Sequence, residues 1–513
     1  MLKPRQRTIA AFAAGAAALA MTLSGCQSAV DLETEATSEP VEGGILTIAQ
    51  ASDAQPANLL AGRLGNQAWA SNVFETLTYQ DADGEPQPLL ATEWALSGDG
   101  LSMDLTIRDD VTFHSGRAMT AEDVKFSFEQ AAAPEWNSQV GYIAKSFEGI
   151  DVVSPTELTI RFSQPTQNIF DFLEYAFIID SETYTGLADG SQVIGTGPFL
   201  FESWSPGTEL TLVRNDEYWG DEAYLDGIEI AVISDSTAML NAVRSDRSQI
   251  AVGMNPVDVQ SMAANDAFTV ENLVGSVYPL GLNVTQAPFD TKEARQGVNF
   301  AIDRERIAEQ IFGDAGVVTN LFWSEDTPGY PEDLANAYAY DPEKARELLA
   351  DAGAEGAEVT INVISLPQNT SVAEIVRNNL EEVGLKPTIN AVETQSFGQR
   401  QIAGDLGQAF MPLHGLNGLG PVTLMDTLPS LREGNSSQFW TDEYVELRTA
   451  LAEAEPGDEF EEALHALSEY IVDEAFTSVI AQSNGQVVVA ETAHDLRWSS
   501  RAYLDAKSAF VTE

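Results

Sequence analysis

The chain has 513 residues and a formal net charge of −53 at pH 7, with 79 acidic and 26 basic side chains. This charge argues against direct nucleic-acid binding, because phosphates would be repelled rather than neutralised. The length favours two or three domains. The acids are spread along the whole chain, so we interpret them as a solvated surface rather than as a device that attracts cationic ligands. Four histidines and one cysteine leave little material for nucleophilic or metal catalysis.

Residues 1–25 have the three parts of a secretory leader. Basic residues come first, an apolar stretch follows over 9–23, and small residues close the segment. The apolar stretch is too short and too rich in Ala and Gly for a membrane-spanning helix. The run 23–26 resembles the lipobox of bacterial lipoproteins, in which the cysteine, here Cys26, is lipidated and becomes the mature N-terminus.

Cys26 is the only cysteine, so its lipidation leaves no disulfide to stabilise the fold. The alternative is an ordinary cleaved signal with a chance cysteine. An acyl anchor holds a soluble domain at a membrane face without spanning the bilayer. The acidic segment 26–42, rich in small residues, is typical of a flexible linker. We therefore predict an extracytoplasmic protein, on the periplasmic or outer face of the cell membrane, attached through Cys26.

From residue 43 onward, strands and helices are predicted to alternate. Alternating β-branched residues favour strands, and a Thr or Asp before an acidic first turn favours a helix start. In chain order, strands are predicted at 45–49, 102–107, 158–162, 210–214, 228–232 and 358–364. Helices are predicted at 66–78, after Thr120, and at 291–312, 341–352 and 371–383. No repeat period is detectable, so the pattern indicates α/β or mixed lobes rather than a solenoid.

One long segment and several later blocks carry a family resemblance. Residues 89–130 read LLATEWALSGDGLSMDLTIRDDVTFHSGRAMTAEDVKFSFEQ. The later blocks are 195–199 with 204, 214–215 and 218–219, then 283 with 288–290, then 295–296 with 299–304, and finally 340–349 with 352–353. Together these blocks resemble the family 5 solute-binding proteins of ABC importers, a group that includes oligopeptide-, dipeptide- and nickel-binding proteins. The resemblance covers about residues 43–510.

Physically, these blocks are typical of a scaffold. Gly195–Pro198 predicts a tight reversal in which the glycines supply unusual φ angles, and it lacks the spacing of a phosphate loop. Asp341 is expected to cap a helix that ends at Gly353. His114 is expected to pack or to form a hydrogen bond. No catalytic, metal or paired-cysteine motif is present, so we predict no enzyme activity, no cofactor and no metal site.

The resemblance implies a two-lobed, periplasmic-binding-protein-like (Venus-flytrap) α/β fold with an extra inserted subdomain. Lobe I would comprise 43–82, 193–285 and 487–513. The inserted subdomain would be 83–192, and lobe II 286–486. Ligand contacts to both lobes would favour the closed state. A monomer of this kind would deliver its ligand to an ABC permease and its ATPase.

In peptide-binding relatives, an acidic residue before the last long helices pairs with the α-ammonium of the ligand. The matching region here is 411–421, and the alignment of its glycines places Leu416 and Leu419 at the usual acidic positions. The first acid after them is Asp426. This departure weakens the dipeptide interpretation. The ligand could be a peptide bound through its backbone as an added strand, or a sugar, an opine-like compound or a metal chelate.

Candidate ligand-binding residues follow from the loops that the resemblance places between the lobes. His414 could bind a metal chelate, form a hydrogen bond to the ligand or serve the loop structurally. Glycines beside it would let backbone amides approach a ligand, and aromatic residues could stack on a sugar or a peptide side chain, or pack in the core. The candidates are Gln50, Ser52, Tyr278, Asn283, His414, Gly415, Asn417 and Trp440.

Three function classes are consistent with the sequence to different degrees. A lipid-anchored receptor for an ABC importer is predicted, with peptides as the ligand and a non-peptide solute as the alternative. A hydrolase of exported polymers would need two well-placed carboxylates, and no motif supports one. The third class is a surface interaction or chaperone-like protein on the same scaffold. The absence of a permease and an ATPase encoded nearby would favour this class, and their presence would favour import.

Overall fold

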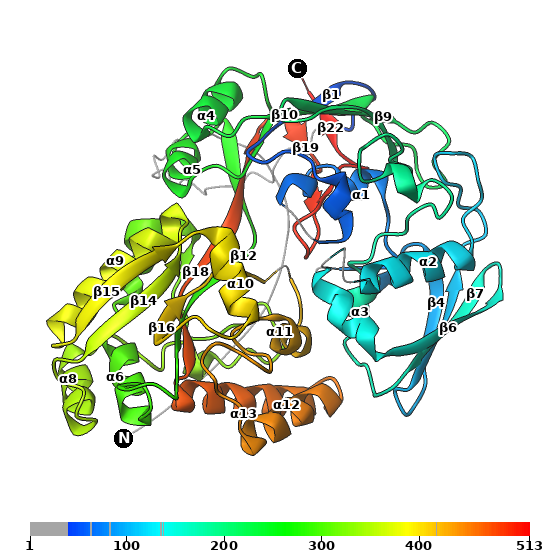
Figure 1. Cartoon of the computed structure of the whole chain (residues 1–513). Helices are drawn as coiled ribbons and strands as arrows, with labels where there is room; N and C mark the ends of the chain where they lie inside the picture. The colour runs from blue at the N-terminus through cyan, green and yellow to red at the C-terminus, as the bar shows by residue number, and fades with distance from the viewer. Residues whose placement is uncertain are drawn as a thin grey trace, which may run out of the picture. The chain divides into compact units, whose positions relative to one another are not determined.

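Two long antiparallel strands, β12 (Phe268–Leu282) and β18 (Thr477–Ala490), run side by side through the structure (Figure 1). The computed structural model describes residues 39–512 except 62–63, 82–83, 134–135, 137 and 417, and the chain from Pro40 onward forms one compact unit. The predicted leader, Cys26 and most of the predicted linker lie outside the described residues.

The strand pair joins two groups of strands into one sheet, in the order β15-β14-β16-β12-β18-β11-β1-β10-β9-β8. The register between β12 and β18 shifts between Leu273 and Ser276. Such an irregularity bends and twists a strand pair. It therefore separates a part of the sheet around β1, which we call the β1 end, from a part around β14, which we call the β14 end.

The β1 end is built on a buried parallel strand. Leu46 and Ile48 on β1 are fully buried, as expected for a strand that pairs on both sides, with β10 and β11. Helices α4 and α5 contact β1, β11 and β12. The elements are β1 (Ile45–Gln50), β8 (Phe199–Ser205), β9 (Glu209–Arg214), β10 (Gly227–Val232), β11 (Ile250–Val252), α4 (Ser236–Arg244) and α5 (Pro256–Ala263).

The β14 end also has parallel strands, because β14 pairs in parallel with both β15 and β16. Helix α9 packs on β14 and β15, and α6 packs on α8 (Figure 1). Helices α12 and α13 lie at the bottom of the view of Figure 1, and α11 lies above them and contacts α12. The elements are α6 (Lys292–Ala301), α7 (Arg304–Ile307), α8 (Pro342–Asp351), β14 (Glu358–Ile364), α9 (Pro367–Glu382), β15 (Lys386–Val392), α10 (Thr394–Ile402), β16 (Ala409–Met411), β17 (His414–Gly415), α11 (Pro421–Thr427), α12 (Asp442–Glu453) and α13 (Asp458–Glu474).

A separate four-stranded antiparallel sheet has the order β4-β5-β7-β6. Its strand β5 alternates between buried and more exposed residues, as expected when one face of a sheet packs on the core and the other faces solvent. Helix α2 covers it, and the Asp123 carboxylate accepts a hydrogen bond from the Thr120 backbone N–H at 3.0 Å, which completes a capping box. The elements are β4 (Ala91–Leu96), β5 (Ser102–Ile107), α2 (Ala121–Ala132), β6 (Phe147–Ser154), β7 (Glu157–Phe162) and α3 (Ile169–Leu173).

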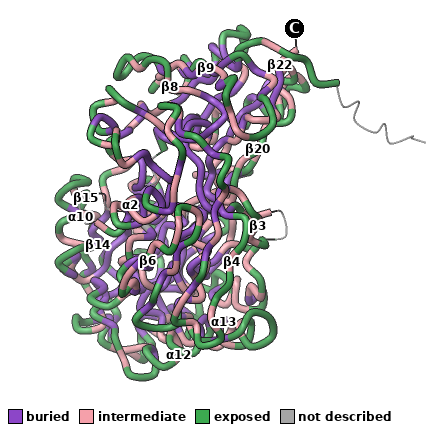
Figure 2. Tube along the Cα trace, turned by 90° about the vertical axis from the view of Figure 1, so that its right-hand side faces the viewer, coloured by how far each residue is buried: buried purple, intermediate pink, exposed green. Residues whose placement is uncertain are grey.

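Short elements complete the described chain. The strands are β2 (Thr78–Gln80), β3 (Pro86–Pro88), β13 (Gly316–Val317), β19 (Ala493–His494), β20 (Arg497–Trp498), β21 (Leu504–Asp505) and β22 (Phe510–Val511). The helical turns are Pro56–Ala61, Leu64–Asn66, α1 (Ala70–Val73), Gln139–Ser146, Tyr184–Gly186, Ala308–Phe312, Gly313–Ala315 and Glu332–Leu334. Figure 2 shows buried residues threading the interior and exposed residues along the outer loops.

Most predicted elements are confirmed, but two helix predictions differ from the structure. The strands at 102–107 and 358–364 have the predicted bounds. Asp341 caps α8, because its carboxylate accepts hydrogen bonds from the backbone N–H groups of Glu343 and Lys344.

The helix predicted at 291–312 is interrupted at Ile302 and Asp303, and it forms α6, α7 and the helical turn Ala308–Phe312. The helix predicted at 66–78 is wrong, because only Ala70–Val73 is α-helical. Trp69 and Phe74 beside it are both buried, so packing on all sides, rather than one amphipathic face, decides the local structure.

The Gly195–Pro198 reversal also differs from the prediction. Neither Gly195 nor Gly197 has a positive φ. A Cβ atom on Gly195 would lie 1.9 Å from the carbonyl oxygen of Val73. Glycine is therefore required here by the close approach of another backbone segment and not by an unusual φ angle.

Candidate functional site

Gln50 lies at the end of β1 and is only 2% exposed. Its Nε2 donates hydrogen bonds to the carbonyl oxygens of Ser52, at 2.5 Å, and Gly65, at 3.0 Å. Its Oε1 is buried and accepts no hydrogen bond within the described residues. An unmet buried acceptor costs free energy, so Gln50 offers an oxygen to which a ligand could donate. Gln50 and Ser52 are thus in contact, and the Ser52 carbonyl oxygen already accepts a hydrogen bond from Gln50.

Tyr278 and Asn283 lie along and just beyond β12. Tyr278 is buried with its ring 4.8 Å from that of Phe312, and burial raises the pKa of its hydroxyl to about 12. The Asn283 side-chain oxygen accepts from the backbone N–H of Thr285, at 2.9 Å, and from its hydroxyl, at 2.7 Å. This is a local turn motif, which engages the Asn283 oxygen within the chain.

His414 and Gly415 form β17, which pairs with β12 opposite Val277 and Ser276. His414 is buried, and its Nε2 lies 2.8 Å from the Ser430 hydroxyl. Burial lowers the pKa of the imidazole to about 4, which leaves the ring neutral at pH 7. In the part of the chain that the structure describes, no group of three or more His, Cys, Asp or Glu side chains gathers as a metal site. These contacts favour the structural role among the three weighed for His414.

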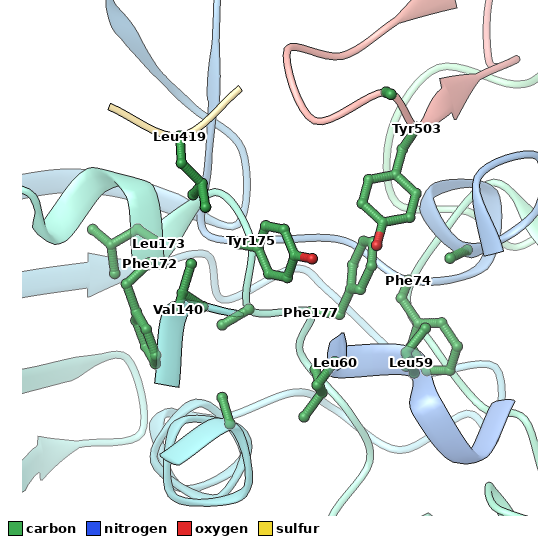
Figure 3. Packing of buried hydrophobic residues seen from close by; sticks show 14 of the residues in the cluster. Leu59, Leu60, Phe74, Val140, Phe172, Leu173, Tyr175, Phe177, Leu419 and Tyr503 are labelled. Atoms are coloured by element: carbon green, nitrogen blue, oxygen red, sulfur yellow. The ribbon is translucent and has the colours of Figure 1, made fainter. Parts of the chain in front are cut away.

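Leu416 and Leu419 are buried in an apolar cluster. The Leu416 backbone N–H donates to the Gly275 carbonyl oxygen at 3.0 Å. In Figure 3, Leu419 lies near Tyr175, and the hydroxyls of Tyr175 and Tyr503 point toward one another. The surroundings of both leucines are thus apolar and aromatic. Asn417, between them, lies outside the described residues.

Trp440 lies two residues before the start of α12. Its ring is 5.5 Å from Tyr444 in an edge-on arrangement, and the Arg448 guanidinium lies 5.0 Å from the ring centroid. It remains 38% exposed. The described contacts of Trp440 are with side chains of α12.

A buried charged network was missed by the sequence analysis. The Arg501 guanidinium donates to Asp171, at 2.8 Å, and to Glu174, at 2.9 Å. It also donates to the Gly418 carbonyl oxygen. Burial raises the pKa of Glu174 to about 7, against the opposing effect of Arg501. Arg501 stands 330 residues from Asp171 and 327 from Glu174, and no motif connects them.

Asp171 extends the network to the start of α11. Its carboxylate accepts from the Gly420 backbone N–H, at 3.1 Å, and from the Thr423 hydroxyl. The Asn168 side chain donates to the Thr423 oxygen at 2.8 Å. Segment 418–423 is thereby fastened to α3 and to the C-terminal loop around Arg501.

A cavity of about 260 Å³ lies beside this network. One wall comes from the chain around Tyr142, Lys145 and Asn168, and the other from α11 and α12, including Val422 and Asp426. Burial raises the pKa of Asp426, which pairs with Arg448 at 2.5 Å. Among the described residues, none of the candidate residues lines this cavity. The cavity is below the usual size of a ligand pocket, about 300–1,000 Å³.

Comparisons with known proteins give the family. The family model "Bacterial extracellular solute-binding proteins, family 5 Middle" matches residues 85–434. Di/tripeptide-binding protein 1 of Pseudomonas aeruginosa is 26% identical over 480 residues, covering 84% of this chain and 87% of that protein. Heme-binding protein A of Haemophilus influenzae is 27% identical over 419 residues, covering 74% and 76%.

Solved structures agree in fold. DppA of Helicobacter pylori, in complex with the peptide STSA, has a TM-score of 0.77 at 21% identity and covers 92% of this chain and 99% of its own. NikA of Brucella suis, in complex with Fe(III)-EDTA, has a TM-score of 0.81 at 19% identity and covers 91% and 100%. At these identities the likeness shows the fold, and it confirms the predicted two-lobed α/β architecture.

The family match spans more than half of the chain. Members of this family are transport receptors and not enzymes, which confirms the resemblance and the prediction of a non-enzyme. None of the helices among the described residues combines the length and the apolar character needed to cross a bilayer. The chain belongs to the bacterial extracellular solute-binding proteins of family 5 and is a solute-binding receptor of the ABC-importer class.

Proposed function

We propose that this chain is a lipid-anchored, extracytoplasmic receptor that binds peptides and delivers them by lobe closure to an ABC permease and its ATPase. The observation that carries the proposal is the family match over 85–434, together with a di/tripeptide-binding relative that covers 84% of the chain. We further propose that the receptor acts as a monomer.

The proposed lobes follow the two ends of the large sheet. Lobe I, with 43–82, 193–285 and 487–513, contains the β1 end, and lobe II, with 286–486, contains the β14 end. The inserted subdomain, 83–192, contains the four-stranded sheet. The register shift between Leu273 and Ser276 favours a bend within β12 itself, close to the first crossing between lobes.

Among the candidate ligand-binding residues, the contacts favour Gln50, because its buried Oε1 has no donor within the described residues. The side chains of Asn283 and His414 already have partners in the chain. A peptide bound through its backbone would supply N–H donors to Gln50 and would not need an acid at position 416 or 419.

A non-peptide solute is the second candidate. It is favoured by the burial of Leu416 and Leu419 in an apolar cluster, at positions where peptide-binding relatives carry an acid. Relatives within the family are named for heme and glutathione as well as for peptides. A sugar, an opine or a metal chelate would also suit a site without a free acid there.

A thermal-shift screen of the mature chain, residues 27–513, tests both candidates. The ligands are di- to pentapeptides, sugars, opines and metal chelates. A ligand that binds only the folded state raises the melting temperature by mass action. A rise with peptides longer than two residues supports the peptide receptor. A rise with a sugar, opine or chelate alone contradicts the peptide proposal and keeps the receptor, and no rise with any solute contradicts both candidates.

The anchor is tested separately by cell fractionation. The full chain with Cys26→Ser should leave the membrane fraction and appear in the soluble extracytoplasmic fraction, because it has no thiol to lipidate. Equal membrane retention of the variant and the parent chain would contradict lipid anchoring. Light scattering of the mature chain should give the mass of a single copy.

A further inference from the structure

The network around Arg501 joins segments that belong to different parts of the fold. Segment 418–423 follows β17 and lies within the bounds of proposed lobe II, 286–486. The C-terminal loop with Arg501 is fastened elsewhere, since Leu504 bonds to Gln67, and its carbonyl oxygen accepts from the Asn72 side chain at 2.9 Å. The contact of Arg501 with segment 418–423 therefore joins proposed lobes I and II, and the contacts of Asp171 join the inserted subdomain to lobe II.

These contacts are buried and charged. The side chains of Arg501 and Glu174 are 2% and 4% exposed, and that of Asp171 is 13% exposed. A buried ion pair recovers its desolvation cost only when further hydrogen bonds satisfy the remaining atoms. Here Gly420 and Thr423 donate to Asp171, and Gly418 accepts from Arg501. Moving segment 418–423 away would remove all three hydrogen bonds together.

Apolar packing accompanies the same contact. Leu419 lies within segment 418–423 and is buried in the cluster that includes Tyr175 and Tyr503. Figure 3 shows Leu419, Tyr175 and Tyr503 within this cluster. The segment thus places one leucine in an aromatic environment while its backbone is held by charged side chains.

We propose that Asp171, Thr423 and Arg501 form a closure lock, which sets ligand affinity through the equilibrium between the open and closed states. The inference rests on the proposed function, because it takes lobe closure as the binding step. Hydrogen bonds that exist only in the closed state shift the opening equilibrium toward closure. Because only the closed state surrounds the ligand, weakening the lock raises the apparent dissociation constant.

Thr423→Val tests the lock, with Thr427→Val as its matched control. Both residues are threonines on α11, but the Thr427 hydroxyl donates to the Thr423 carbonyl oxygen at 2.8 Å within the helix. Valine at 423 removes the hydrogen bonds to Asp171 and from Asn168. The expected result is a dissociation constant raised about 10-fold for Thr423→Val, the usual scale of a hydrogen bond to a charged group, and unchanged for Thr427→Val.

A distance measurement tests the lock without any ligand. Fluorophores on Val153→Cys and Ile402→Cys, in a Cys26→Ser background, report the separation of the inserted subdomain and lobe II, because both sites are exposed, at 66% and 78%. Thr423→Val should shift the ligand-free population toward larger separations, and Thr427→Val should not. Arg501→Lys, which keeps the charge but loses the planar fork, should shift it in the same direction.

The outcomes separate this inference from the proposed function. An unchanged distance distribution in Thr423→Val and Arg501→Lys, with only a lower melting temperature, overturns the lock and makes the network purely structural. Equal ligand affinity of Thr423→Val and Thr427→Val overturns it as well, while the receptor function stands. A shifted distance distribution in a chain that binds none of the solutes screened supports the lock and contradicts the proposed function.

Discussion

The carboxylate of Glu75 accepts a hydrogen bond from the hydroxyl of Tyr218 at 2.6 Å. Trp219 and Thr196 donate to the same carboxylate, each at 2.8 Å. Glu75 is buried at the end of the segment that contains α1. This one carboxylate therefore joins that segment to the Gly195–Pro198 reversal and to the Tyr218–Trp219 block, which explains physically why these blocks belong to one scaffold.

Glu75 predicts a pH-dependent stability. Burial raises the pKa of Glu75 to about 7 in spite of the hydrogen bonds, from an ordinary value of 4.5. A carboxyl whose pKa is raised by folding stabilises the fold fully below pH 4.5, and this contribution is lost as the pH rises through 7. Urea unfolding of the wild type and of Glu75→Gln at pH 4.5, 6 and 7.5 checks this.

The free energy of unfolding of Glu75→Gln should be about 1–3 kcal/mol lower than that of the wild type at every pH. The reason is that the new amide nitrogen, itself a donor, would lie against the groups that donate to Glu75. The free energy of unfolding of the variant should also fall less between pH 4.5 and 7.5 than that of the wild type. Parallel pH profiles of the two proteins would contradict the assignment. Glu174, whose pKa is also raised to about 7 by burial, contributes in the same direction to both proteins.

His414 predicts the opposite pH effect. Burial lowers the pKa of its imidazole to about 4, from an ordinary value of 6.5. Its neutral form therefore stabilises the fold above pH 6.5, and this contribution is lost as the pH falls toward 4. The variant His414→Gln should lose less stability than the wild type between pH 6.5 and 4, as measured by chemical unfolding. An NMR titration that puts the His414 pKa at 6 or above would contradict the prediction.

Arg304 is predicted to be essential for the stability of the β14 end. The buried guanidinium donates to the carbonyl oxygens of Asn299, at 3.0 Å, and Val479, at 3.0 Å. It also donates to the Tyr338 carbonyl oxygen at 3.2 Å, and burial lowers its pKa to about 9. Arg304→Met should cost about 3 kcal/mol, because several buried carbonyl groups would lose their donor.

Urea unfolding measures the effect, with Arg306→Met as the control on the same helix. The Arg306 side chain is exposed and donates to Gln310. Its loss should change the free energy of unfolding by no more than about 0.5 kcal/mol. Equal losses of unfolding free energy in the two variants would contradict the prediction that the buried hydrogen bonds of Arg304 stabilise the fold.

Gly195→Ala is predicted to be strongly destabilising, because the new Cβ would lie 1.9 Å from the Val73 carbonyl oxygen. We expect a loss of about 3 kcal/mol or a chain that does not fold. Gly98→Ala is the control, since no atom lies within 4 Å of a Cβ built there and its φ is not positive. Thermal unfolding of both variants decides the point, and an unchanged melting temperature for Gly195→Ala would contradict the close backbone approach.

Local signals explain which elements could be predicted from the sequence. The Asp341 cap and the strand over 358–364 depend on residues within a few positions of one another, and both are confirmed. The helix predicted at 66–78 failed because Trp69 and Phe74 are buried by distant parts of the chain. The sequence predicts a turn at Gly195, but the requirement for glycine comes from the close approach of the Val73 backbone, on another segment.

By itself, the sequence determined the family and the α/β class, because ordered motifs and local alternation are properties of neighbouring residues. Only the tertiary structure decided which polar groups have partners. Gln50 keeps an unpartnered oxygen within the described residues, His414 is engaged by Ser430, and Arg501 meets Asp171 across most of the chain length. Such pairings depend on how segments distant in the sequence pack and exclude water, which no local pattern encodes.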